Sequence, residues 1–104
     1  MTRFQVIVDP ELKSILPRYM ELRWEELELL EHAIQVDDAE IIRMLGHKLK
    51  GTGSSYGFHA LTQLGAAIEI TGKSGNLDET KKLSAQLRDY LENVDIVYQE
   101  RDTT

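Results

Sequence analysis

Apolar residues recur at steps of three and four along most of this chain, and that spacing limits what it can fold into. The first such segment, about residues 17–36, carries the stripe Leu16, Met20, Trp24, Leu27, Leu30 and Ile34. One apolar stripe is typical of a helix that packs against other helices. Similar segments follow from residue 37 into the glycine-rich stretch 46–57, over 58–71 and over 76–100. Because the connections are short, we predict an all-α fold, an antiparallel four-helix bundle.

Two of these helices start at residues that favour helix N-termini. Asp37 is followed three residues later by Glu40, and Asn76 is followed three residues later by Glu79. A side-chain oxygen at the first position can accept a hydrogen bond from the backbone of the first turn. We therefore predict N-caps at both positions.

The N-terminal residues have a different pattern. Phe4, Val6 and Val8 alternate along the segment 3–8, which is typical of a strand, but a partner strand is not evident. We expect residues 1–9 to form an extended arm that packs on the bundle. Asp9, Pro10 and Glu11 then suit a helix start, which predicts a short extra helix over about residues 10–16. The bundle domain is expected to cover residues 10–100, with a frayed tail over 101–104.

Charge and composition exclude several classes of partner and chemistry. The 104 residues include 12 basic and 18 acidic side chains, giving a net charge of −6 and a pI near 5.0. This balance argues against nucleic acid or an anionic membrane as the partner. The chain has no cysteine, which excludes thiol nucleophiles and zinc-thiolate sites and fits a cytoplasmic protein. Apolar runs long enough to span a membrane are missing from the sequence.

One histidine points away from the predicted core. At 100° per residue, His47 lies about 140° from Ile42 and about 160° from Leu45 and Leu49, which form the apolar stripe of its helix. Its neighbours on the outer face are Arg43, Lys50, Gly51 and Ser54. An exposed neutral imidazole has a free lone pair on one ring nitrogen. Lys50 could reduce charge repulsion with an anionic group at that nitrogen. The alternative is an ordinary surface histidine.

Glycines near this histidine suggest that its surroundings have a use. A glycine inside a helix costs about 1 kcal/mol relative to alanine, and Gly46, Gly51 and Gly53 all fall within one predicted helix. Gly51, one turn after His47, would leave the imidazole unshielded and let another protein approach. Gly57 could allow close helix packing, make the sharp turn into the next helix, or cap this one.

Together, these residues resemble the histidine-phosphotransfer (Hpt) domain of multistep phosphorelays. The resemblance rests on His47-Lys48-Leu49-Lys50-Gly51, on Gly57 ten residues after the histidine, and on the later Leu61, Leu64, Ile68 and Glu69. The segment 51–58 is especially similar to the phosphoacceptor domain of chemotaxis histidine kinases. The helical pattern matches over about residues 10–100.

The resemblance implies roles for particular residues. His47 would accept a phosphoryl group, with Lys50 beside it to screen charge and Gly51 and Gly57 shaping access. Glu69 would hydrogen-bond the imidazole and set its tautomer, although it could equally be a solvated glutamate. We expect Arg43, Ser54 and Ser55 near the docking surface.

The resemblance also implies partners. They would be a response-regulator receiver domain, a sensor histidine kinase, or both. Transfer needs a metal ion and acidic residues around the other reactant, so we expect Mg²⁺ on the receiver and no metal or cofactor here. The chain would then be a phosphocarrier and not an enzyme.

Two other functions remain open at this stage. The chain could be the phosphoacceptor domain of a histidine kinase, or a helical interaction bundle that is never phosphorylated. Other catalytic patterns fit poorly, because His32, His47 and His59 lack tight metal-ligand spacing and residues 46–51 are not followed by the lysine of a P-loop.

Overall fold

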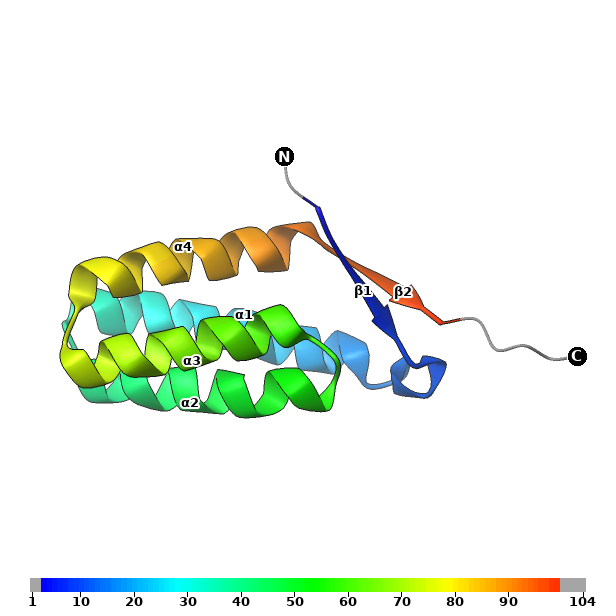
Figure 1. Cartoon of the computed structure of the whole chain (residues 1–104), viewed down its shortest axis with the longest axis horizontal. Coiled ribbons are helices and arrows are strands. Elements are labelled where there is room, and N and C mark those ends of the chain that lie inside the picture. Colours follow the sequence, from blue (N-terminus) through cyan, green and yellow to red (C-terminus); the bar gives the residue numbers. More distant parts are fainter. Residues whose placement is uncertain (1–2, 100–104) are drawn as a thin grey trace, which may run out of the picture.

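The computed structural model describes residues 3–99, which form a four-helix bundle with a two-stranded sheet at one end (Figure 1). In chain order the elements are β1 (Phe4–Val8), a 3-10 turn (Pro10–Leu12), α1 (Leu16–Gln35), α2 (Ala39–Ser55), α3 (His59–Ser74), α4 (Leu77–Asn93) and β2 (Val94–Tyr98). The predicted all-α bundle is confirmed. Within the described residues, no helix has the length and apolar character needed to cross a membrane.

Short polar side chains cap the N-termini of α2 and α4. Asn76 accepts a hydrogen bond from the backbone N–H of Glu79 at 3.2 Å, as predicted. The cap of α2 is Asp38, which accepts from the N–H of Ile41 at 3.1 Å. The prediction of Asp37 was therefore wrong by one residue, because Asp37 takes a left-handed conformation with φ 54° in the connection between α1 and α2.

The core lies along the axis of the bundle, where all four helices contribute. Its most buried large side chains are Leu16, Leu27, Leu30, Ile42, Phe58, Leu61 and Ile68. Near the α2–α3 turn, the ring of Tyr19 stacks on Phe58 and also contacts Tyr56, with centroid distances of 5.5 and 4.3 Å. This aromatic group fixes the position at which α2 ends and α3 begins.

The extended arm has a partner that the sequence did not reveal. β1 pairs in parallel with β2, in a register that places Phe4 opposite Val94 and Val8 opposite Tyr98. The last helix was predicted to reach residue 100, but α4 ends at Asn93. Residues 94–98 are rich in β-branched and aromatic side chains, which favour a strand once a neighbouring strand supplies hydrogen bonds. The predicted frayed tail, residues 101–104, lies outside the described residues.

The short extra helix predicted over residues 10–16 does not form, so that prediction was wrong. Only one 3-10 turn forms there, capped by Asp9, which accepts from the N–H of Glu11 at 2.9 Å. Pro17 lies in the first turn of α1, where its missing N–H leaves no hydrogen bond unmade. The long helix therefore starts at Leu16 and the preceding segment remains a turn.

Candidate functional site

His47 lies on the outer face of α2, as the helical spacing predicts. Its side chain is 66% exposed. Ile42 and Leu49, from the apolar stripe of the same helix, are 2% and 4% exposed. The imidazole is therefore presented to solvent from a helix whose opposite face is fixed in the core.

Glu69 on α3 contacts both polar neighbours on α2. Its Oε2 lies 2.7 Å from Nδ1 of His47, and its Oε1 accepts a hydrogen bond from Nζ of Lys50 at 2.8 Å. The Glu69 side chain is only 10% exposed. Hydrogen bonds from Lys50 and then from His47 lower the pKa of Glu69 from 4.5 to about 2. The carboxylate stays ionised at neutral pH and therefore accepts a hydrogen bond from Nδ1–H. In the neutral ring this leaves the lone pair on Nε2, which points away from Glu69.

Two glycines make this contact between helices possible. A side chain on Gly46 would collide with the backbone of Glu69, and one on Gly65 would collide with the backbone of Lys50. At these two positions the helices α2 and α3 therefore approach more closely than helices with ordinary side chains. The short distance between the backbones lets a glutamate from α3 reach an imidazole that faces solvent on α2.

A comparison with protein families identifies the arrangement. The model of the Hpt domain family matches residues 20–96. The chain belongs to this family. Neither the curated proteins nor the solved structures include a match to it. Membership assigns the chain a histidine-phosphotransfer role in phosphorelay signalling, in which Hpt domains act as phosphocarriers between receiver domains and kinases.

Gly51 and Gly57, the two glycines expected to shape access to His47, lie in different surroundings. Gly51 is exposed, one turn after His47, and a Cβ there would meet nothing within 4 Å. Gly57 has a φ of 84° in the turn between α2 and α3, and a Cβ there would also meet nothing. It therefore makes the turn, and close helix packing at this position is excluded. Ten residues along a helix span about 15 Å, which places Gly57 away from the imidazole.

The two lysines next to His47 point in different directions. Lys50 pairs with Glu69, whereas Nζ of Lys48 lies 3.4 Å from Glu26 of α1. Glu26 is itself buried and paired with Arg23. Lys50 is thus the lysine on the His47 side, and Lys48 belongs to the contact between α1 and α2.

The remaining predicted residues flank the imidazole along α2. Arg43, one turn before His47, is held by Glu40 through two hydrogen bonds of 2.5 and 3.2 Å. Ser54 is exposed two turns after it, and Ser55 donates to the carbonyl of Gly51 at 3.4 Å.

Met44, which was not among the residues predicted from the sequence, also lies on this face and is 52% exposed. It lies three residues before His47 and about 160° from Ile42, so the same helical arithmetic would have found it. Met44 adds an apolar side chain to the face that carries His47.

The site has no metal-ligating cluster of its own in the part of the chain that the structure describes. Residues 3–99 bring together no group of three or more histidine, aspartate and glutamate side chains that could hold an ion. The arrangement instead offers one nucleophilic nitrogen, one carboxylate behind the ring and one ammonium beside it.

Proposed function

We propose that this Hpt domain accepts a phosphoryl group on Nε2 of His47 and exchanges it with the aspartate of a response-regulator receiver domain. The observation that carries the proposal is the 2.7 Å contact between Glu69 and Nδ1, on a ring that is otherwise exposed. This contact supports the tautomer in which Nδ1 holds the proton and Nε2 holds the lone pair.

The proposed transfer does not require a proton to leave the imidazole ring. The Nε2 lone pair attacks phosphorus, the N–P bond forms, and the P–O bond to the receiver's aspartate breaks to release its carboxylate. The ring gains positive charge, which the ionised Glu69 offsets through the Nδ1–H hydrogen bond. The reverse sequence returns the phosphoryl group to a receiver.

Lys50 is suited to screen the charge of the transferred group. Its side chain is 40% exposed, so the ammonium is accessible to a phosphoryl oxygen near His47. Its hydrogen bond to Glu69 keeps it close to the imidazole before the partner arrives. Charge-assisted hydrogen bonds, such as the one proposed from Lys50 to a phosphoryl oxygen, typically contribute about 1.5–3 kcal/mol.

The surface around His47 suits a modest, transient interface. Met44 supplies an apolar contact, Gly51 leaves space for the partner's backbone, and Arg43 and Ser54 supply polar contacts on either side. A receiver that carries its own Mg²⁺ and acidic residues would complete the reaction centre, so this chain would act as a phosphocarrier without catalytic machinery of its own.

A second candidate is the phosphoacceptor domain of a histidine kinase. It is favoured by the segment 51–58, which resembles the start of chemotaxis kinases. In that case a separate kinase catalytic domain with ATP would label His47, while phosphorylated receivers would transfer poorly.

One experiment tests both candidates. The protein is incubated with a phosphorylated receiver and Mg²⁺, and separately with a histidine kinase and ATP. We expect an acid-labile, base-stable label that is lost in His47→Gln. The matched control is His32→Gln, which alters an exposed histidine on α1 and should keep the label. An unlabelled protein in both reactions would favour an interaction bundle and contradict the proposal.

A further inference from the structure

Away from the relay site, β1 has one backbone edge without a neighbouring strand. The sheet has two strands, and β2 pairs with one side of β1. The carbonyl of Val8 accepts a hydrogen bond at 2.9 Å from the N–H of Gln99, just after β2. Because successive residues of a strand direct their backbone groups to opposite sides, Val8 and the alternate residues before it face β2. The N–H and C=O of Gln5 and Ile7 therefore face the other side, where they have no hydrogen-bond partner among residues 3–99.

The sequence of β1 does not protect this edge. The strand reads Phe-Gln-Val-Ile-Val, without the charged residues or proline that natural proteins place on exposed edges. The side chain of Ile7 is 65% exposed and lies opposite Val97, which is 40% exposed. An open edge with exposed apolar side chains readily pairs with another chain. β1 is therefore suited to accept a third strand.

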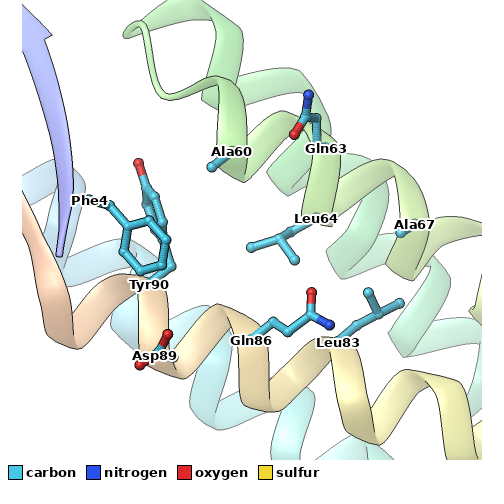
Figure 2. A pocket seen from close by; sticks show the side chains of 9 residues that line it. All are labelled: Phe4, Ala60, Gln63, Leu64, Ala67, Leu83, Gln86, Asp89 and Tyr90. Atoms are coloured by element: carbon cyan, nitrogen blue, oxygen red, sulfur yellow. The ribbon is translucent and has the colours of Figure 1, made fainter. Parts of the chain in front are cut away.

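A hollow of about 520 Å³ lies along the open edge. Residues 4–7 of β1 line it together with Gly57, His59 and Ala60 at the α2–α3 turn and Tyr90 of α4. Among the described residues, none of the β2 strand belongs to this lining, so the hollow lies on the free side of β1. Figure 1 shows β1 at the end of the bundle where α2 turns into α3. Figure 2 shows Phe4 beside Tyr90, with Ala60 across from them on α3.

The backbone groups at this edge specify what can occupy the hollow. Gln5 and Ile7 offer donors and acceptors in alternation, and an extended polypeptide is the ligand that matches all of them. The β1 strand of a second copy fits less well. In that copy Phe4 and Val6 pack against the core, so the strand would bring its own bundle against the α2–α3 turn that bounds the hollow.

Charge narrows the choice of segment further. Asp9 directly follows β1, Asp89 directly precedes Tyr90, and both are exposed. The chain as a whole has a net charge of −6. Basic residues at the ends of a bound segment are therefore favoured over acidic ones.

We propose that β1 binds an extended segment of a partner protein as an antiparallel third strand, with basic residues at the ends of the segment. Residues that pair with Gln5 and Ile7 place their side chains on the exposed face, and the residues between them point to the side of Phe4 and Val6. The segment therefore alternates polar and apolar side chains. The lining of the hollow includes none of the relay residues, so the proposal is independent of the relay function.

A synthetic peptide and two methylated forms test the backbone pairing. The probe is acetylated, amidated Lys-Val-Thr-Val-Thr-Val-Lys, whose two threonines would pair with Gln5 and Ile7. N-methylation of both threonines removes the N–H groups that face β1, whereas N-methylation of the first two valines removes N–H groups that face away. We titrate each peptide into the full chain and follow the backbone amide NMR signals of Gln5 and Ile7.

The unmethylated peptide is expected to shift both amide signals saturably and to slow their hydrogen exchange about tenfold or more. The threonine-methylated peptide should bind about fivefold or more weakly than its valine-methylated isomer, because it lacks two hydrogen bonds to the edge. Equal affinities of the two isomers, or no saturable shift with the unmethylated peptide, would overturn the proposal.

Variants of β1 then locate the binding. Ile7→Pro removes an N–H that faces away from β2, a position at which a strand tolerates proline, so the fold should persist while peptide affinity falls about fivefold or more. Gln5→Pro is the second variant if the first does not fold. Ile7→Thr changes the side chain, keeps the N–H and should bind the peptide nearly as the parent does. Sedimentation analysis checks the other occupant: a dimer of the parent chain that the peptide dissociates would assign this edge to a second copy and contradict the proposal.

Discussion

Glu69 Oε2 lies 2.7 Å from Nδ1 of His47, although the two residues are on different helices and differ sharply in exposure. The imidazole is available to a partner while the carboxylate behind it is almost buried. This combination lets one ring nitrogen be fixed by the protein and the other remain free for chemistry. Because Lys50 holds the other oxygen of Glu69, the three side chains form one linked group.

Replacing Glu69 by glutamine should slow phosphoryl transfer without unfolding the bundle. A neutral amide cannot offset the positive charge of the phosphorylated ring, and its NH₂ group can donate to Nδ1 and favour the other tautomer. We expect transfer from a phosphorylated receiver to fall about tenfold or more, which corresponds to about 1.4 kcal/mol of barrier. Rapid-quench kinetics measure the rate, and ¹⁵N NMR of His47 reports the tautomer.

Glu40→Gln is the matched control for this change, since Glu40 is an exposed carboxylate on the same helix as His47 and pairs with Arg43. Its transfer rate should stay near that of the parent. An unchanged rate and tautomer in Glu69→Gln would contradict the positioning role.

The lowered pKa of Glu69 predicts a specific pH dependence of stability. The folded value is about 2 and the ordinary value is 4.5. Since the folded pKa is the lower one, the carboxylate stabilises the fold above pH 4.5, and this contribution is lost as the pH falls toward 2. The difference in Tm between the parent and Glu69→Gln should therefore narrow over that window, as measured by circular dichroism. A constant difference from pH 6 to pH 2 would count against the contact.

The four helices could be predicted from the sequence, but the pairing of the two strands could not. Helical spacing predicted all four helices and the outward direction of His47, because both follow from local periodicity. The pairing of β1 with β2 joins residues about ninety positions apart, and a short run such as 94–98 fits a helix or a strand equally well by periodicity. Only the finished bundle brings these two segments together.

The functional site likewise has one part that the sequence predicts and one part that it does not. The residues along α2 could be placed from spacing alone, but the contact of Glu69 with His47 depends on how closely α2 and α3 pack. That distance is set by Gly46 and Gly65 from opposite helices, and one sequence does not show which glycines face each other. The roles proposed for Lys50, Gly51, Arg43 and Ser54 in transfer and docking stay predictions.

Alanine at Gly46 or Gly65 should destabilise the fold. Each added methyl group would meet backbone atoms of the facing helix, which cannot rotate away as a side chain can. We expect a loss of about 1–3 kcal/mol in the free energy of unfolding, measured by urea denaturation.

Gly51→Ala gives the opposite result in the same helix, because nothing lies within 4 Å of its Cβ. This change should stabilise by about 0.5–1 kcal/mol through the helix preference of alanine. Equal effects at Gly46 and Gly51 would show that α2 and α3 do not approach as described.

Lys50→Ala should slow transfer, with Lys48→Ala as its control. The two lysines lie on the same helix, but only Lys50 reaches the carboxylate that contacts His47. Loss of a charge-assisted contact to the phosphoryl group predicts a decrease of about tenfold in rate. Lys48→Ala should leave the rate near that of the parent while lowering Tm slightly, since it removes a contact to Glu26. Equal rates in the two variants would remove Lys50 from the mechanism.

Gly51→Leu should block docking while leaving the fold intact. The position is exposed and its surroundings are empty, so a leucine side chain fits the isolated domain and also favours the helix. One turn away, however, it would occupy the space that a partner needs to reach Nε2 of His47. We expect at least a tenfold lower rate of transfer from a phosphorylated receiver, with an unchanged or higher Tm. A small phosphodonor such as phosphoramidate, which needs no docking surface, should still label this variant at the rate of the parent. If both donors were slowed equally, the leucine would be acting on the imidazole itself and the docking role of Gly51 would be wrong.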